Sequence, residues 1–209
     1  MKGKFIVFEG SDGSGKTTVL NRVKKYLDDT GKDYVLTREP GGTEISEDIR
    51  SILLDKANKE MTPMTEALLY AAARAQHVEE VILPNIEAGR IVISDRYVMS
   101  SLAYQAYGRK LDYKEVKDIN DYATGRLRPD YTIFLNVDPI TVLNRKKNNV
   151  EADRLEEESE SYHERVYRGY QEMIASQGDS FILIDASRNL EEVTAEVIKK
   201  LEEIIGGGK

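Results

Sequence analysis

One short motif limits the folds open to this chain more than any other feature. An apolar segment, Phe5–Glu9, leads into Gly10-Ser11-Asp12-Gly13-Ser14-Gly15-Lys16-Thr17, and a segment with helical periodicity follows. Two glycines flanking four residues, followed by Lys and Thr, form a phosphate-binding P-loop when a strand precedes them and a helix follows. A glycine-rich turn that only caps a helix is the alternative, and it accounts poorly for this context. The motif predicts an α/β fold that binds a nucleoside triphosphate.

The residue types in the loop suit that task. The glycines let successive backbone amides turn toward phosphate oxygens, and the helix N-terminus adds its partial positive charge. Lys16 is expected to reach the β and γ phosphates, and the Thr17 hydroxyl to ligate Mg²⁺. The expected triphosphate-binding residues of the loop are Gly10, Ser11, Asp12, Gly13, Ser14, Gly15, Lys16, Thr17 and Thr18.

Apolar segments and helical segments alternate along the rest of the chain. This alternation is typical of a parallel sheet covered on both faces by helices, with ligands at the carboxyl ends of the strands. We expect strands at Phe5–Glu9, Tyr34–Thr37, Ile91–Ser94, Tyr131–Val137 and Phe181–Ile184, and helices at about 15–29, 44–56, 63–88, 98–107, 113–124, 139–147, 159–177 and 190–204. With 209 residues, no repeat and no linker, the chain is predicted to form one three-layer P-loop domain over 1–205, with a five-stranded parallel sheet and a flexible tail at 206–209.

Composition excludes several classes of function. The absence of cysteine rules out disulfides, thiolate zinc sites and thiol nucleophiles. A net charge of −7 argues against a protein that coats nucleic acid, and no apolar run approaches the roughly 20 residues of a membrane span. The two histidines, His77 and His163, lie among charged neighbours and are expected to be solvated or half-buried. We expect a cytoplasmic protein that binds neither nucleic acid nor membranes.

Two further motifs follow predicted strands. Asp95 ends the apolar segment Ile91–Ser94 and is the expected Walker-B-like carboxylate, which holds the metal or its water shell. Arg96 follows it, and either braces phosphate oxygens or forms a plain salt bridge. At the end of the second strand, Arg38-Glu39-Pro40-Gly41-Gly42-Thr43 combines an arginine, a turn and a helix start, which is a second anion-binding geometry. Two phosphate sites at neighbouring strand ends indicate a kinase whose acceptor is itself a phosphate.

On these motifs the chain resembles the thymidylate kinases. The resemblance is carried by Arg38–Thr43 and Asp95–Gln105, and it extends through Thr65–Arg74 and Gly125–Asp130 to Asp153–Glu156. It implies that ATP and Mg²⁺ are used to phosphorylate deoxythymidine monophosphate (dTMP) to its diphosphate in dTTP biosynthesis, and that the protein is a homodimer. A P-loop kinase for another nucleoside monophosphate is the alternative. A nucleotide-binding switch is less favoured, because the chain has no Asn-Lys-x-Asp motif for reading guanine.

The resemblance also implies an acceptor pocket with a part for each portion of dTMP. Arg38, Arg50 and Arg96 would contact the acceptor phosphate, and the Tyr70 ring would stack on thymine. Arg74 and Gln105 would hydrogen-bond to the base, with Ser101 beside it. Tyr104 would crowd the sugar 2′ position, and Asp12 would lie near the 3′-hydroxyl and the magnesium, with Glu39 and Pro40 also in the pocket. The expected metal contacts are Thr17, Asp95 and Asp12. Without the resemblance, helical spacing favours Tyr70 as a core residue.

A lid is predicted over about 144–160, the most polar and least periodic part of the chain. Some thymidylate kinases have a basic residue in the P-loop, at the position of Gly13, and others have the catalytic arginine in the lid. The chain is similar to the second kind. Arg154 would then settle on the transferring phosphoryl group, with Arg145 near the donor base or the lid hinge. The expected catalytic residues are Lys16, Arg96, Arg154 and Asp12.

Overall fold

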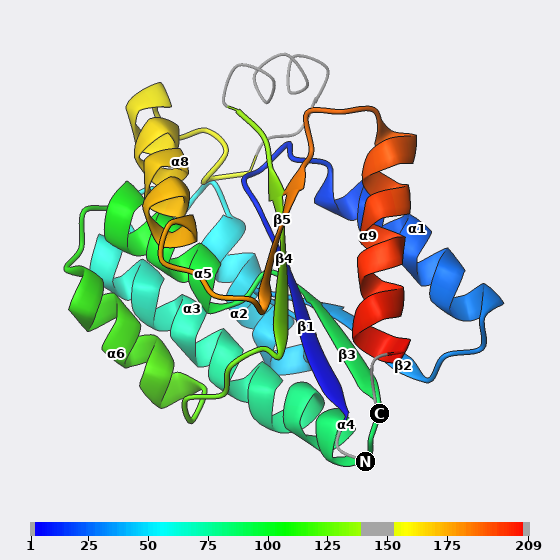
Figure 1. Ribbon diagram of the computed structural model, residues 1–209. Coiled ribbons are helices and arrows are strands. Elements are labelled where there is room, and N and C mark those ends of the chain that lie inside the picture. The colour runs from blue at the N-terminus through cyan, green and yellow to red at the C-terminus, as the bar shows by residue number, and fades with distance from the viewer. Residues whose placement is uncertain (1–2, 139–152, 207–209) are drawn as a thin grey trace.

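A computed structural model describes residues 3–138 and 153–206 of the chain. Its five strands form one parallel sheet in the order β2-β3-β1-β4-β5 (Figure 1). The strands are β1 (Lys4–Glu9), β2 (Tyr34–Arg38), β3 (Ile91–Asp95), β4 (Tyr131–Asn136) and β5 (Phe181–Asp185). The predicted fold class is confirmed, and each predicted strand is correct to within one residue at each end.

The helices lie close to their predicted positions. They are α1 (Lys16–Asp29), α2 (Glu44–Leu54), α3 (Pro63–His77), α4 (Leu83–Glu87), α5 (Val98–Ser101), α6 (Tyr113–Ala123), α8 (Glu160–Ile174) and α9 (Leu190–Gly206). Side-chain caps explain several starts: Thr43 accepts from the Ser46 amide, and Thr62 accepts from the Thr65 amide directly before Pro63. The helix predicted at 139–147 lies outside the described residues.

Two predicted helices change their winding part of the way along. The predicted helix 63–88 is α3 followed by a π-helical turn, η1 (Val78–Ile82), and then α4. The predicted helix 98–107 begins as α5 and continues as a second π-helical turn, η2 (Leu102–Gly108). Single π turns occur frequently at functional sites, and η2 carries two predicted site residues, Tyr104 and Gln105.

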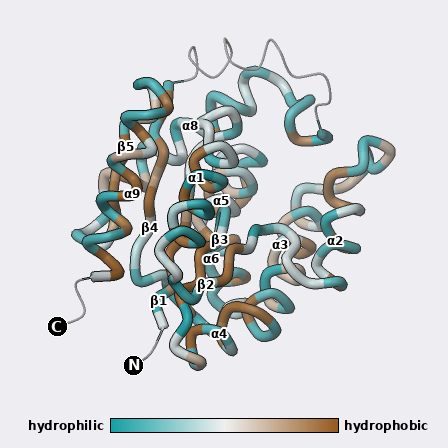
Figure 2. The backbone as a smooth tube through the Cα atoms, turned by 90° about the vertical axis from the view of Figure 1, so that its right-hand side faces the viewer, coloured by the Kyte–Doolittle hydropathy of each residue, from teal (hydrophilic) through white to brown (hydrophobic). Residues whose placement is uncertain are grey.

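Alternation along the strands builds a core on each face of the sheet. In β1, Ile6 and Phe8 belong to the cluster that packs against α1 and α9, whereas Phe5 and Val7 belong to a cluster under η1 and α4. Helices α2, α3, α5, α6 and α8 lie on that second side, opposite α1 and α9, with the strands between the two layers (Figure 1), and several strand segments are coloured brown, as hydrophobic, in Figure 2. Burying each such large apolar side chain contributes about 1.5–3 kcal/mol. The three-layer arrangement therefore follows from the strand pattern.

The sheet register aligns the predicted motifs at the carboxyl ends of neighbouring strands. Asp95 at the end of β3 is level with Phe8 in β1 on one side and with Arg38 in β2 on the other. The P-loop, the Arg38 turn and Arg96 therefore leave the sheet side by side, as expected for the ligand end of a parallel sheet.

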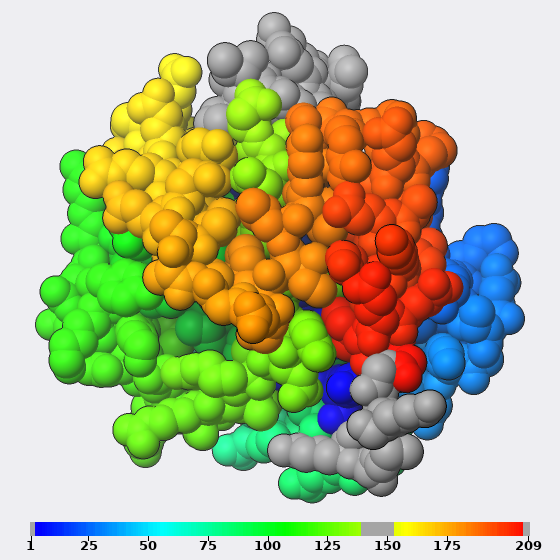
Figure 3. Space-filling view, viewed as in Figure 1, coloured from blue at the N-terminus to red at the C-terminus, as the bar shows by residue number. Residues whose placement is uncertain are grey.

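The last strand of the sheet, β5, lies at the lateral edge opposite β2 and carries no predicted motif. There β5 runs between α8 and α9 on the surface (Figure 3), and Leu183 in this strand is 48% exposed. None of the helices in the described part of the chain is long and apolar enough to span a membrane. The cytoplasmic location stays a prediction.

Candidate nucleotide-binding site

The loop between β1 and α1 has the backbone that a P-loop requires. Gly10, Gly13 and Gly15 have φ angles of 143°, 82° and 89°, in the region that favours glycine. At Gly10 a side chain is also excluded by space, because a Cβ atom there would lie 2.6 Å from the carbonyl oxygen of Leu135. The glycine spacing recognised in the sequence is therefore imposed by the turn from β1 into α1.

Lys16 is held inside this loop. The residue is 7% exposed, and its Nζ donates to the carbonyl oxygens of Gly10 (2.8 Å) and Ser11 (3.2 Å). Burial, together with the nearby positive charge of Arg96, lowers the pKa of Lys16 to about 8. The ammonium group thus lies at the start of α1, where phosphate oxygens would bind.

Two buried polar atoms beside Lys16 have no hydrogen-bond partner among the described residues: Ser14 Oγ and Asp95 Oδ1. Buried polar atoms are nearly always paired in folded proteins, so both atoms suit a ligand. In the described ranges no three acidic or histidine side chains form a metal cluster. Mg²⁺ commonly uses only one or two protein ligands and completes its shell with phosphates and water. Asp95 and the exposed Thr17 fit that pattern.

Arg96 adopts an unusual backbone conformation directly after β3. Its φ is 72°, which is uncommon for a residue other than glycine. Two hydrogen bonds hold it there: its amide donates to Phe8 O (2.8 Å), and its carbonyl accepts from Ser94 Oγ (2.9 Å). The turn directs the guanidinium toward the P-loop, where it forms an ion pair with Asp12. Arg96 thus forms an ion pair, and it does so next to the P-loop, where phosphate bracing would also need it; the bracing role stays a prediction.

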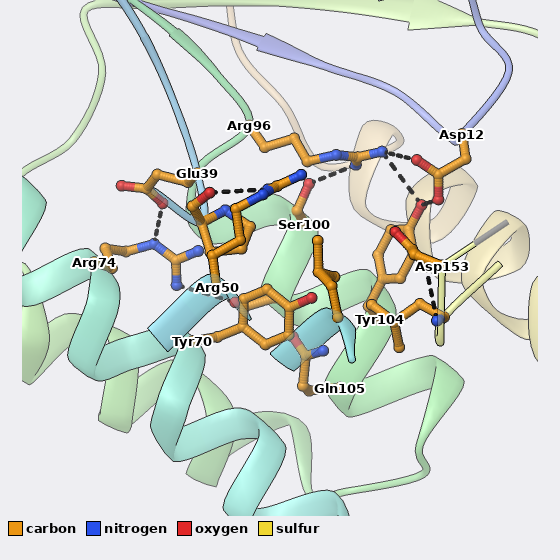
Figure 4. A pocket seen from close by; sticks show the side chains of 14 residues that line it. Asp12, Glu39, Arg50, Tyr70, Arg74, Arg96, Ser100, Tyr104, Gln105 and Asp153 are labelled. Atoms are coloured by element: carbon orange, nitrogen blue, oxygen red, sulfur yellow. Dashed lines mark hydrogen bonds and ion pairs between the residues drawn. The ribbon is translucent and has the colours of Figure 1, made fainter. Parts of the chain in front are cut away.

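Asp12 belongs to the P-loop and also lines a neighbouring pocket, together with Arg96 and Tyr104. One of its carboxylate oxygens pairs with Arg96, and the other accepts from the Tyr104 hydroxyl at 2.6 Å (Figure 4). The Arg96 guanidinium also lies over the Tyr104 ring, 5.2 Å from its centroid. The pocket is lined by Asp12, Glu39, Pro40, Arg50, Leu54, Tyr70, Arg74, Arg96, Ser100, Ser101, Tyr104, Gln105, Asp153 and Leu155. Ten of the eleven predicted dTMP-binding residues are thus brought together.

Arg74 is one of the most buried polar residues of the pocket, at 2% exposed. Its Nε donates to Glu39 at 2.5 Å, and its Nη1 donates to Ser101 Oγ at 3.0 Å and to Asn120. Its Nη2 donates to the carbonyl of Tyr97 at 3.3 Å. These bonds fix the plane of the guanidinium, as recognition of a flat polar ligand requires.

Gln105 is oriented by a buried carboxylate. Its Nε2 donates to Glu66 Oε1 at 3.0 Å, and Glu66 also accepts from Arg109 and Arg154. An ionised carboxylate only accepts hydrogen bonds, so the amide nitrogen of Gln105 must face Glu66. No hydrogen bond from another described residue is found at the side-chain carbonyl oxygen of Gln105, so this oxygen can serve as an acceptor.

Tyr70 fits both interpretations that the sequence left open. It packs in the cluster that contains Leu102, Tyr104 and Tyr162, and its ring also lines the pocket beside Arg50 (Figure 4). Burial raises its pKa, so the hydroxyl is neutral. Arg50 itself donates to the Pro40 carbonyl at 2.9 Å.

Two predicted site arginines lie elsewhere. Arg38 is 51% exposed and pairs with Glu47 at 2.8 Å, and it is not among the described residues that line the pocket. Arg154 is buried, and its guanidinium donates to Leu53 O and Glu66 Oε2, both at 2.8 Å. The pocket is lined by its neighbours Asp153 and Leu155 instead. Arg145 lies outside the described residues.

Sequence reasoning missed several buried residues around the site. Glu9, Glu66, Ser100, Asn120 and Tyr170 all bind or surround pocket side chains. The only signal for Glu9 was an acid at the end of an otherwise apolar strand. His77 was expected to be solvated or half-buried, but it is fully buried and contacts Glu39 and Thr37, because α3 packs against the β2 turn.

Comparisons with known proteins show the family of the chain. The sequence profile of the thymidylate kinase family matches residues 8–197. A thymidylate kinase from Lactobacillus delbrueckii subsp. bulgaricus is 52% identical over 202 residues, covering 95% of each chain. One from Finegoldia magna is 49% identical over 198 residues, covering 95% of this chain and 97% of the relative, and one from Symbiobacterium thermophilum is 47% identical over 201 residues, covering 96% and 94%. With a match over nearly its whole length, the chain belongs to the thymidylate kinase family.

Proposed function

We propose that this protein transfers the γ-phosphoryl group of ATP, bound in the P-loop, to a phosphate oxygen of dTMP bound in the neighbouring pocket. As a member of the thymidylate kinase family, it is a phosphotransferase that phosphorylates dTMP in nucleotide biosynthesis. The residue roles and the use of Mg²⁺ are the parts proposed here.

The observation that carries the proposal is the position of Asp12. It is a residue of the P-loop, and both of its carboxylate oxygens bind pocket side chains, Arg96 and Tyr104. The donor and acceptor sites therefore share one wall, and two phosphorylated ligands could meet across it. Holding two reactants in line is itself a large contribution to catalysis.

The chemistry at that wall needs charge stabilisation more than proton transfer. Lys16 and the loop amides would hold the β and γ phosphates of the donor, and Arg96 would hold oxygens of the acceptor or of the transferring group. An acceptor phosphate is already ionised near neutral pH, so no general base is required. Bound Mg²⁺ would neutralise phosphate charge, and Thr17 and Asp95 are the side chains that would hold it.

The far end of the pocket suits a pyrimidine that has an N–H group next to carbonyl oxygens. Arg74 and Ser101 can donate to a base carbonyl, and the Gln105 carbonyl can accept from the ring N–H. The Tyr70 ring would stack on the base. Cytosine lacks that N–H, so the same groups would discriminate against it.

A panel of acceptors tests the substrate. ADP release from ATP is measured with dTMP, dUMP, dCMP, dGMP and dAMP, each with and without Mg²⁺. We expect the highest kcat/KM for dTMP, and a requirement for the metal. Preference for another nucleotide would support the related-kinase alternative, and ATP hydrolysis that no acceptor accelerates would support the switch alternative.

The homodimer implied by the family also belongs to the proposal. Exposed apolar side chains lie on the adjacent helices α2 and α3, namely Ile45 (54%), Ile52 (48%) and Leu68 (50%). Ile45 and Ile52 are seven residues apart and so share a helix face. We expect the dimer mass in size-exclusion chromatography with light scattering, and the monomer mass after Ile52→Glu and Leu68→Glu.

A further inference from the structure

A buried carboxylate behind the site has no part in the function proposed above. Glu9 is the last residue of β1 and is fully buried. Its Oε1 accepts from the backbone amides of Tyr97 (2.9 Å) and Ser100 (3.1 Å). Its Oε2 accepts from the hydroxyls of Ser100 (2.7 Å) and Tyr170 (3.3 Å). Both of these hydroxyls also contact Arg96.

The carboxylate sets the direction of the hydrogen bonds around it. A serine hydroxyl has a single hydrogen and two lone pairs. At Ser100 the hydrogen points to Glu9, which leaves a lone pair for Arg96 Nη1 at 2.9 Å. The single hydrogen of the Tyr170 hydroxyl is shared between two acceptors, Ser100 Oγ at 3.0 Å and Glu9 Oε2 at 3.3 Å. The Tyr170 oxygen accepts from Arg96 Nη1 as well, at 3.3 Å. Arg96 is therefore met by two acceptors on the side away from Asp12.

We propose that Glu9 is a positioning residue, which directs the Arg96 guanidinium toward the phosphoryl group by orienting the hydroxyls of Ser100 and Tyr170 as acceptors. The inference rests on the role proposed for Arg96 above. Four segments meet in this cluster, because Glu9 comes from β1, Arg96 from the turn after β3, Ser100 from α5 and Tyr170 from α8.

The backbone of Arg96 explains why such support is needed. A non-glycine residue with φ near 70° persists only when its surroundings hold it. The main chain of Arg96 is bonded to Phe8 and Ser94, whereas the end of its long side chain is held, in the described part of the chain, by polar neighbours and by the Tyr104 ring. Asp12 and Tyr104 draw the guanidinium toward the P-loop, and the Glu9 cluster limits how far it moves.

The charge of Glu9 is essential to this arrangement. Burial raises the pKa of Glu9, while Arg96 and the hydrogen bonds from Ser100 and Tyr97 oppose the rise. A glutamine of the same shape would present an N–H group that could donate to the two hydroxyls. Their hydrogens would then turn toward Arg96 and repel it. The Glu9→Gln variant therefore changes the polarity of the cluster while largely keeping its volume.

The experiment uses the full-length enzyme and the variants Glu9→Gln, Tyr170→Phe and Tyr162→Phe. Tyr162 is a matched control, because it is a buried tyrosine on the same helix whose hydroxyl binds only the Tyr104 carbonyl among its described contacts, at 3.4 Å. Measured quantities are kcat and the KM for dTMP and for ATP, together with the melting temperature.

We expect kcat/KM for dTMP to fall about 10- to 100-fold in Glu9→Gln and about 5-fold in Tyr170→Phe. The KM for ATP should stay within about twofold in both variants, because the loop that binds ATP is made mainly of backbone groups. Tyr162→Phe should stay within about twofold in every parameter. If Glu9→Gln does not fold, Tyr170→Phe and its control still decide the outcome.

Combining each variant with Arg96→Ala separates positioning from a general structural role. If Glu9 acts through Arg96, replacing Glu9 lowers kcat/KM for dTMP little further in a protein that already lacks the guanidinium. Full additivity, or wild-type kinetics in Tyr170→Phe, would overturn this inference alone. Wild-type kinetics in Arg96→Ala would overturn the proposed role of Arg96 as well, and this inference with it.

Discussion

The donor and acceptor sides of the site are built in opposite ways. The donor side is mainly one continuous stretch of backbone groups around Lys16, joined by Asp95 from the end of β3. Two buried atoms there, Ser14 Oγ and Asp95 Oδ1, have no partner in the described residues. The acceptor side is assembled from side chains of many segments, and its arginines already bind other protein groups. The contrast indicates that a donor-side change removes contacts with the ligand directly, whereas an acceptor-side change acts through neighbours.

The largest effect is expected on the donor side. Lys16→Ala removes the only side-chain cation of the loop and should lower kcat by at least about 1,000-fold. The protein should remain folded, because the hydrogen bonds of Lys16 Nζ to described residues go to carbonyl groups of its own loop. Steady-state kinetics and the melting temperature check both statements. A loss of less than about tenfold would show that the loop amides suffice to hold the donor.

On the acceptor side, Arg154→Ala tests whether this arginine serves stability or catalysis. The variant leaves the buried Glu66 with Arg109 and Gln105 as partners but without one charged hydrogen bond, so it should lower the free energy of unfolding by about 1.5–3 kcal/mol. Arg168→Ala, on the exposed side of α8, is the control and should leave the melting temperature unchanged.

The alternative for Arg154 is the lid role implied by the family resemblance. It predicts a large loss of kcat with little change in the KM for dTMP or in stability. Measuring urea denaturation and kinetics on the same variant separates the two roles. An unchanged urea midpoint together with a kcat reduced about 100-fold would contradict the structural role.

This contrast also explains how much could be predicted from the sequence. The P-loop is a local structure: its glycines, Lys16 and the following helix are adjacent in the chain, so one motif specified the geometry and the strand before it. The alternation of apolar and helical segments predicted the sheet for the same reason. Even Asp95 was found by its position at a strand end.

The acceptor side could not be derived in this way. Its contacts join residues up to 161 positions apart, such as Glu9 and Tyr170, and no periodicity shows which buried polar groups will meet. The family resemblance supplied most of the pocket residues, but it did not show that Arg154 pairs with Glu66 or that His77 is buried against Glu39. Those contacts depend on how the helices pack.

A smaller effect is expected from pH, again on the donor side. Because the pKa of Lys16 is lowered to about 8, the free enzyme loses this positive charge as pH rises through that value. We expect kcat/KM for ATP to fall about tenfold per pH unit above 8. In Lys16→Arg, which cannot lose its proton, the inflection should disappear. A wild-type decline that begins only near pH 10 would show that the lysine is not perturbed.

The same group has an opposite effect on stability. In the unfolded chain the pKa of Lys16 is near its usual 10.5. Between pH 8 and about 10.5 the unfolded chain therefore keeps the lysine proton that the folded protein has released. The contribution of Lys16 to the free energy of unfolding should therefore rise between pH 8 and about 10.5, and stay constant below pH 8. Urea denaturation of the wild type and of Lys16→Arg at several pH values isolates this contribution.

The smallest effect is expected at the wall that the two sides share. Tyr104→Phe removes the hydroxyl that donates to Asp12 at 2.6 Å, but it keeps the ring against which Arg96 and the sugar would rest. The loss of one hydrogen bond should lower kcat/KM for dTMP about fivefold. The preference for the deoxyribose over the ribose form of the acceptor should be unchanged, because in the role implied by the family resemblance the bulk of the ring would exclude a 2′-hydroxyl. Tyr104→Ala, which removes the ring, should reduce that preference. If Tyr104→Phe is already enough to make the protein accept the ribonucleotide as well as dTMP, the selection depends on the Tyr104 hydroxyl and its bond to Asp12 in the P-loop. The donor and acceptor sides would then be more tightly linked than the contrast between them suggests.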